Sequence, residues 1–242
     1  MPLRDHYRPP LFPLFQWESF HGQWAGAIVR DLNTHLLPPG YIAAPFISLQ
    51  GGIEVDVGAL HGDAAAPRNT DGAIAVLPYA PPKASISAPV DFTGLQTFEV
   101  KIMEAGTARF AAAIELVSRA NKDRPANRDA FATKCLSYLQ QGTSVIVVDA
   151  VTDRRGNFLK QILGSLKVIE NLPTSDLLYA GALRTFKDPA GVVHVEGWYD
   201  DMRLGAPLPE LPLWLAVDLA VPLNLEESYQ KTCEELRLPE TD

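Results

Sequence analysis

Cysteine is scarce in this chain of 242 residues, in which only Cys135 and Cys233 occur. They form no Cys-x-x-Cys pair, so a zinc site of the finger type is excluded and a disulfide framework is not expected. Long apolar runs are also lacking, because no stretch approaches the roughly 18–20 apolar residues that span a bilayer. The N-terminus mixes charge, proline and aromatics and lacks the apolar core of a signal peptide. We therefore expect a soluble, cytoplasmic protein without membrane contact.

Several catalytic signatures are absent as well. The chain has no Gly-x-x-x-x-Gly-Lys-Ser/Thr loop and no Gly-x-Gly-x-x-Gly, which disfavours nucleotide binding of those types. It has no Gly-x-Ser-x-Gly, so serine hydrolase chemistry is unsupported. Positive charge is in the minority: 21 Lys and Arg stand against 29 Asp and Glu, a formal net charge of −8. Nucleic acid can then bind only through a locally basic patch.

The remaining composition is that of an ordinary globular protein. Hydrophobic residues make up 47% and charged residues 21%, which excludes a wholly disordered chain, a coiled coil and a collagen-like fibre. The length suits a single domain, 1–242. Within it we expect an extended arm at 1–15, a core at 16–151, and a β-rich extension with a terminal helix at 152–242.

Apolar periodicity predicts the elements of this domain. Steps of three and four from Gln16 to Leu37 indicate an amphipathic helix. A second helix is expected from Arg128 to Gln141, after a charged loop at 119–127. Strands are expected at Tyr41 to Gln50, Ile53 to Leu60, Thr97 to Glu104, Arg109 to Ser118, Ser144 to Val151, Leu177 to Phe186, Val192 to Trp198 and Leu213 to Leu219. The order predicts an α/β fold whose mixed central sheet is flanked by helices.

Glu115 is the most informative residue, because it interrupts an otherwise apolar strand. A buried carboxylate is costly unless it is paired, protonated or bound to a metal. Asp56 and Glu54 share one face of a second strand, which we expect in the same sheet. Carboxylates that meet at a sheet edge can hold Mg²⁺ (or Mn²⁺), and such an ion activates water and neutralises phosphate charge. These three acids are therefore candidate metal ligands.

The competing interpretation of Glu115 is a structural ion pair with Lys134, Lys122 or Arg128. All three cations lie in the segment 119–134, which has a local net charge of +3 and follows the strand of Glu115. A DNA substrate would need such cations beside the carboxylates, whereas a solvated charged helix end is the ordinary explanation. Lys134 borders the apolar stripe of its helix, so its side chain can point inward.

Together these residues resemble the PD-(D/E)XK nuclease superfamily. The shared features are an Asp on the second strand, a Glu on a later central strand, a helix with Lys134-x3-Tyr138-x3-Gly142, and a strand that ends in Val148-Asp149. The similarity is greatest to a bacterial branch of restriction-endonuclease-like proteins, in which a Glu-x-x-Ser strand end precedes a Lys-x3-Tyr-x3-Gly helix. Here that strand end is Glu115-Leu116-Val117-Ser118.

Over nearly its full length the chain is similar to the bacterial domain-of-unknown-function family 4058. The matching segments are MPLRDH, Trp17 to His21, Glu54 to Val57, Ala113 to Pro125, and Arg128 to Asp149. The nuclease resemblance implies a restriction-endonuclease-like core at 16–151 and a Mg²⁺-dependent (or Mn²⁺-dependent) phosphodiesterase that acts on DNA through the basic segment 119–134. Asp56, Glu115 and Glu54 would bind the metal, and Lys134 or Lys122 would orient water or stabilise the phosphate.

One departure from the superfamily favours a different function. Its catalytic lysine should lie two residues after the Glu, at a position that Val117 occupies here. The alternative is therefore a catalytically inactive binding or regulatory module on the same fold, which contacts a partner through the charged loop 119–128. His21 lies on the apolar face of the first helix, and we expect it to be a hydrogen-bonded core residue. The oligomeric state stays open, a homodimer included.

A second pattern competes for the site. Asp91, Glu99 and Lys101 fit Asp-x7-Glu-x-Lys, but so short a pattern often arises by chance. The strand that carries Glu99 and Lys101 alternates polar and apolar residues, which favours a solvated surface pair.

Overall fold

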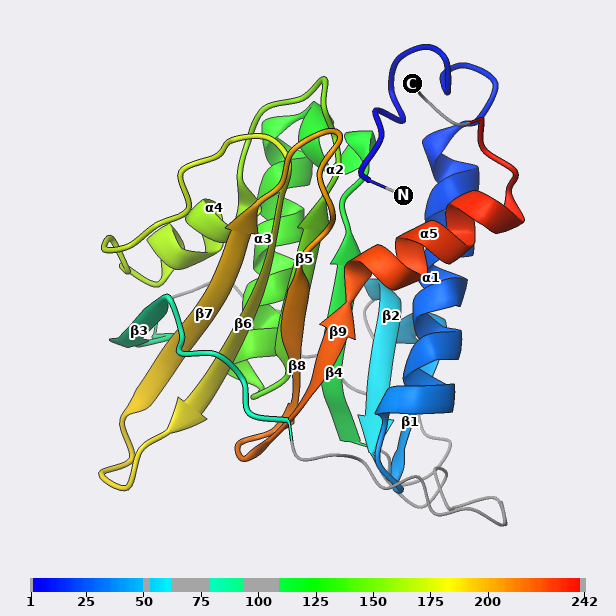
Figure 1. Cartoon of the computed structure of the whole chain (residues 1–242). Coiled ribbons are helices and arrows are strands. Elements are labelled where there is room, and N and C mark those ends of the chain that lie inside the picture. The colour runs from blue at the N-terminus through cyan, green and yellow to red at the C-terminus, as the bar shows by residue number, and fades with distance from the viewer. Residues whose placement is uncertain (1, 50–52, 62–78, 94–108, 240–242) are drawn as a thin grey trace.

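The computed structural model describes residues 2–49, 53–61, 79–93 and 109–239, with only the backbone described at 46–49 and 53–54. Within these ranges a mixed sheet of seven strands has the order β1-β2-β4-β5-β6-β7-β3, and β8 and β9 form a second, two-stranded sheet. Figure 1 shows α3 and α4 behind the large sheet, with α1, α5 and the β8–β9 hairpin in front of it. The fold is thus mixed α/β.

The first half of the chain builds one edge of the large sheet. Its described elements are α1 (Trp17–Asp31), the π-helical turn η1 (Leu32–Leu36), β1 (Tyr41–Leu49), β2 (Ile53–His61), β3 (Ile86–Pro89) and β4 (Arg109–Leu116). β1 pairs with β2, and β2 with β4, all antiparallel, whereas β3 pairs with β7 at the far edge. The strand predicted at 97–104, with Glu99 and Lys101, lies outside the described residues.

The crossover from β4 to β5 (Ser144–Asp149) makes these two strands parallel. It contains α2 (Arg119–Asp123) and α3 (Pro125–Gln140), so the prediction of a loop at 119–127 is wrong. A capping box explains α2, because Ser118 donates through both its backbone N–H and its hydroxyl to Asn121 Oδ1, each at 2.8 Å. Pro125 then starts α3 at a position that suits its fixed φ.

The second half of the chain continues the same sheet. Its elements are α4 (Phe158–Ser165), β6 (Tyr179–Lys187), β7 (Val193–Asp201), β8 (Glu210–Ala216), β9 (Leu219–Asn224) and α5 (Leu225–Glu235). β6 pairs antiparallel with β5, and β7 with β6. The predicted hairpin and terminal helix are confirmed, but the single strand predicted at 213–219 is wrong. A turn between Ala216 and Leu219 divides that stretch between β8 and β9.

The N-terminal arm has neither helix nor strand, yet it packs closely on the core. Leu3, Tyr7 and Leu11 are buried. The backbone of Leu3 donates to Ala206 O and accepts from Gly205 N, each at 2.9 Å. In Figure 1 the arm lies beside α1, near the end of the sheet where β4 and β5 finish. It therefore helps to enclose that end of the sheet.

Close packing at β6 gives a stability prediction. A Cβ at Gly181 would lie 2.4 Å from Leu159 Cδ1 and 3.0 Å from Trp198 O. Gly181→Ala should therefore lower the free energy of unfolding by about 1–3 kcal/mol, measured by urea denaturation. The control is Gly164→Ala in α4, where a Cβ meets nothing within 4 Å and should leave stability unchanged or slightly raised. Equal stabilities of the two variants would contradict this packing.

Candidate functional site

Glu115 enters the core at the end of β4, where its side chain is 2% exposed. Lys134 Nζ donates to Glu115 Oε2 at 2.7 Å, and the Tyr138 hydroxyl donates to Oε1 at 3.2 Å. Both donors belong to α3 and are four residues apart, so they lie on the same face of the helix. The structure thus confirms the ion pair with Lys134, and both oxygens of Glu115 accept hydrogen bonds from α3.

Burial dominates the electrostatics of this pair. Desolvation raises the pKa of Glu115 to about 7, although the charge of Lys134 and the hydrogen bonds from Lys134 and Tyr138 act in the opposite direction. The charge of Asp56 adds to the rise in the pKa of Glu115. Desolvation lowers the pKa of Lys134, but the carboxylate of Glu115 more than offsets this, so that pKa is raised. Glu115 therefore changes between its protonated and ionised forms near neutral pH.

Asp56 lies where β2 and β4 separate. The last residues paired there are Val57 and Ile114, and beyond them Asp56 Oδ2 accepts the backbone N–H of Leu116 at 2.8 Å. The carboxylate thus provides an acceptor just beyond the last residue pair of the ladder. This hydrogen bond explains why a partly buried acid is present here, and no catalytic role is needed to account for it.

His21 of α1 contacts the same oxygen, Oδ2 of Asp56. Its Nε2 lies 3.3 Å from Asp56 Oδ2 and 3.1 Å from Leu116 O. Because both atoms are acceptors here, Nε2 must carry the hydrogen. Desolvation lowers the pKa of His21, but the hydrogen bond and charge of Asp56 outweigh it, so the pKa is raised. The predicted hydrogen-bonded histidine is confirmed, and its contact with Asp56 is new.

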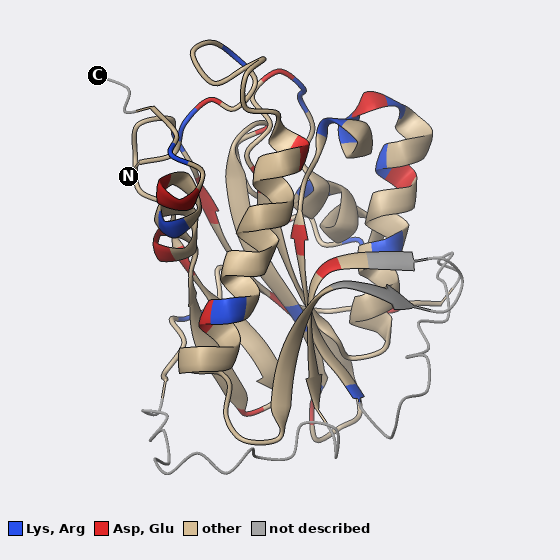
Figure 2. Ribbon diagram, turned by 90° about the vertical axis from the view of Figure 1, so that its right-hand side faces the viewer, with Lys and Arg blue, Asp and Glu red and all other residues tan. Residues whose placement is uncertain are grey.

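The two acids are thus held by helices from opposite layers. α1 supplies the partner of Asp56 and α3 the partners of Glu115, and Figure 2, which views the sheet from its β1 edge, shows these helices on either side of it. The acids remain close enough to interact, since the charge of Asp56 affects the pKa of Glu115 and of Lys134. The side chain of Glu54, the third predicted ligand, lies outside the described part of the structure.

Lys122 belongs to a different buried pair. Its Nζ lies 2.6 Å from Asp149 Oδ2, and both side chains are fully buried. Desolvation raises the pKa of Asp149, against the effect of the neighbouring ammonium. The Lys122 ammonium also lies 6.0 Å from the centre of the Tyr179 ring. The structure therefore places Lys122 with Asp149 rather than with Glu115.

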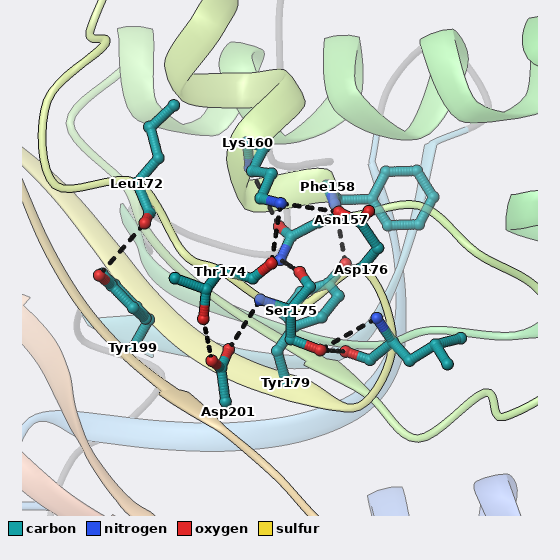
Figure 3. A network of polar contacts seen from close by, with 11 residues as sticks. Asn157, Phe158, Lys160, Leu172, Thr174, Ser175, Asp176, Tyr179, Tyr199 and Asp201 are labelled. Atoms are coloured by element: carbon teal, nitrogen blue, oxygen red, sulfur yellow. Dashed lines mark hydrogen bonds and ion pairs between the residues drawn. The ribbon is translucent and has the colours of Figure 1, made fainter.

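A polar network at the start of α4 positions this helix (Figure 3). The Tyr179 hydroxyl accepts the backbone N–H of Phe158 at 2.8 Å. Asn157 caps the helix and donates through Nδ2 to Ser175 O at 2.8 Å, while the Ser175 N–H donates to Asp201 Oδ1 at 3.3 Å. These contacts satisfy backbone groups of a long connection, so we assign them a structural role.

The arrangement does not fit a Mg²⁺ site as it stands. Asp56 and Glu115 offer the oxygen ligands that Mg²⁺ prefers. However, Glu115 already accepts from Lys134 and Tyr138, and Oδ2 of Asp56 accepts from Leu116 and lies against His21. Among the described residues, no three His, Cys, Asp or Glu side chains gather in a way that could hold a metal ion. A Mg²⁺ ion would have to share the oxygens of Glu115 with the two donors from α3.

Comparison of the chain with protein-family models, with curated proteins and with solved structures gave no match. The resemblance to family 4058 and to the PD-(D/E)XK nucleases therefore stays a prediction from motifs. No helix in the described ranges has the length and apolar character needed to cross a membrane.

Sequence reasoning missed two partners in this region. The spacing of three and four that places His21 on the inner face of α1 could not show that it meets Asp56, because that contact depends on where β2 and β4 separate. The pairing of Lys122 with Asp149 was missed because α2 was not predicted. Ser118 followed by Asn121 at the N3 position was the available signal.

The first prediction for this site concerns Lys134→Met. Loss of the ammonium removes an attraction and a hydrogen bond that lower the pKa of Glu115, so that pKa should rise above 7. Carboxyl ¹³C NMR titration measures it. The control Lys231→Met removes an exposed lysine of α5 that pairs with Glu227, and should leave the Glu115 titration unchanged. An unaltered titration in Lys134→Met would contradict the assigned contact.

The second prediction concerns stability against pH. Because the folded pKa of Glu115, about 7, exceeds its ordinary value of 4.5, the folded state binds this proton more tightly. Its contribution is fully present below pH 4.5 and is lost as pH rises towards 7, a change of roughly 3 kcal/mol. Glu115→Gln should flatten the decline in urea-unfolding free energy over this window. His21 gives a decline of the same sign, which remains in the variant.

The matched control is Glu235→Gln. Glu235 is half-exposed and pairs with Arg30 at 2.8 Å. Its neutralisation should therefore leave the pH dependence of the unfolding free energy as it is in the parent chain. If Glu115→Gln leaves the pH dependence of the unfolding free energy unchanged, the pKa of Glu115 is not raised and the prediction is wrong.

Proposed function

We propose that this chain is a catalytically inactive binding module with a restriction-endonuclease-like arrangement. One observation carries the proposal: the acids that would hold a metal already bind side chains of the chain itself. Glu115 accepts from Lys134 and Tyr138, and Asp56 lies against His21. In this arrangement they join helices to strand ends rather than presenting free oxygens to a substrate.

The order of elements supports the nuclease-like arrangement. α1 is followed by β1, β2 and β4, which are antiparallel neighbours, and α3 then leads to β5, parallel to β4. Asp56 lies on the second of these strands and Glu115 on the third, while Lys134 lies on the helix between the parallel strands. This is the arrangement on which the resemblance rests.

The surroundings of Glu115 favour an inactive site. Val117, at the position of the expected catalytic lysine, is fully buried and brings no charge. Lys122, the other candidate, is enclosed with Asp149. A general base or metal ligand must reach the substrate or its water, and Glu115 is 1% exposed. The residues therefore hold the scaffold together while a partner binds elsewhere.

A second candidate function is the Mg²⁺-dependent (or Mn²⁺-dependent) phosphodiesterase acting on DNA. It is favoured by the mutual charge interactions of Asp56, Glu115 and Lys134, and by the partial exposure of Asp56 and Lys134 at 18% and 19%. Asp56 and Glu115 would hold the ion, which would supply an activated water. Lys134 would have to leave Glu115 Oε2 and contact the phosphate instead.

Calorimetry and plasmid cleavage distinguish the two functions. We expect no saturable uptake of Mg²⁺ or Mn²⁺ at millimolar concentration, and no nicking of supercoiled plasmid beyond an EDTA-treated sample. Metal uptake together with cleavage, both lost in Asp56→Asn and in Glu115→Gln, would establish the phosphodiesterase and overturn the inactive module. Thermal unfolding of both variants serves as the control for correct folding.

A further inference from the structure

A buried histidine joins the N-terminal arm to the core. His6 lies midway along the arm and has no exposed surface. Its ring centre lies 4.1 Å from that of Phe20 and 5.2 Å from that of Trp17, both in α1. The ring centre of Tyr229 in α5 lies 5.7 Å away. His6 is therefore enclosed by aromatic rings from two helices, on the arm that helps to enclose the end of the sheet (Figure 1).

The polar contacts of His6 suit the neutral form of its ring. Nε2 lies 2.8 Å from the Tyr229 hydroxyl, which also accepts the backbone N–H of Arg4 at 3.1 Å. The other ring nitrogen, Nδ1, is buried and has no hydrogen-bond partner within the described part of the chain. A protonated imidazole carries an N–H at both nitrogens. Protonation would therefore bury a positive charge whose Nδ1–H has no acceptor, which is costly.

The charged groups of the arm do not compensate such a charge. Burial is the main reason why the pKa of His6 falls to about 3, the charge of Arg4 adds to the fall, and the charge of Asp5 opposes it. The carboxylate of Asp5 is engaged elsewhere, because its Oδ1 accepts the Tyr7 N–H at 3.0 Å and the Thr152 hydroxyl at 2.7 Å.

The helices that face His6 bring no compensating charge either. The contacts from α1 are the rings of Trp17 and Phe20. From α5 come Tyr229 and the Cys233 thiol that interacts with it. Burial raises the pKa of Tyr229, and it raises the pKa of Cys233 to about 11, so both groups are neutral at and below neutral pH. A proton on His6 is thus opposed from both sides of the interface.

The docked arm has other unmatched polar groups. The Tyr7 hydroxyl and Trp17 Nε1 are buried, and neither has a hydrogen-bond partner among the residues that the structure describes. Each group gives up water for no new partner when the arm docks, which reduces the free energy that favours docking. The arm also has neither helix nor strand to hold it independently of the core. A further unfavourable group, such as a charged imidazole, therefore acts on an interface that already contains unmatched groups.

We propose that His6 is a pH-sensitive switch, whose protonation releases residues 2–11 from the core while the sheet stays folded. Release would uncover the groups that the arm contacts beside the candidate site. These include Arg119, whose guanidinium lies 4.3 Å from the centre of the Tyr7 ring, and Thr152, which follows β5 and donates to Asp5. The inference goes beyond the proposed function and holds whether or not the site is catalytic.

The direction of the switch follows from the two proton affinities of His6. Its pKa is about 3 in the docked arm, against an ordinary value of 6.5 once the arm is released into solvent. Docking is therefore favoured most above pH 6.5 and is weakened as the pH falls towards 3. Between pH 8 and pH 5 the equilibrium should shift towards the released arm by roughly thirtyfold.

Hydrogen–deuterium exchange of the full chain, corrected for the intrinsic rate at each pH, tests the proposal. From pH 8 to pH 5 the protection of the arm amides, such as those of Leu3 and Arg4, should fall roughly thirtyfold. The amides of β5 should not lose protection, because the sheet stays folded. In His6→Phe, which keeps an aromatic ring but cannot gain a proton, arm protection should change by less than about threefold over the same range.

Two further variants complete the test. The matched control His35→Phe removes an exposed histidine and should behave like the parent chain. Tyr229→Phe removes the hydroxyl that contacts His6 and Arg4, so it should lower arm protection by about tenfold already at pH 8. The inference is overturned if the arm of the parent chain is unprotected at pH 8, or if its protection does not depend on pH. It is equally overturned if His6→Phe shows the same fall, or if β5 loses protection together with the arm.

Discussion

The pairing of Glu115 with Lys134 and Tyr138 is the contact on which this end of the molecule depends. A carboxylate in an apolar strand needs donors, and α3 supplies two of them from one face. Because these donors lie on the crossover helix, satisfying Glu115 also fixes how α3 lies against the sheet beside the parallel pair β4–β5. Glu115 thereby joins β4 to α3 and fixes the position of the crossover that leads to β5.

Asp56 and His21 perform the corresponding task on the opposite layer. They join α1 to the place where β2 and β4 stop pairing, and Leu116 takes part through its backbone N–H and carbonyl. Polar groups that a sequence motif assigns to catalysis thus satisfy one another across the layers. Desolvation raises the pKa of Glu115, whereas in His21 desolvation lowers the pKa and the hydrogen bond and charge of Asp56 outweigh it. Both pKa values are therefore raised, and both groups make stability fall as the solution becomes alkaline.

The cations of the crossover show a division by chemistry. The two lysines point inward to carboxylates, whereas the exposed Arg124 shares the carboxylate of Asp123 with Arg154 of a later segment. A lysine ammonium is compact enough to be matched by one buried acid, whereas the guanidinium of arginine is planar and offers five donors in a fixed geometry.

The sequence by itself determined the elements with strong periodicity, because spacing along one strand or helix decides which residues share a face. It also offered Lys134 as one of three possible ion-pair partners of Glu115, while the hydrogen bond from Tyr138 was not predicted. It could not predict α2, the turn between β8 and β9, or the partners of Asp56 and Lys122. Those depend on a short capping box, a two-residue turn and the point where two strands separate. Only the tertiary structure decided which buried charges meet, since a carboxylate and its donor can be brought together from any distance along the chain.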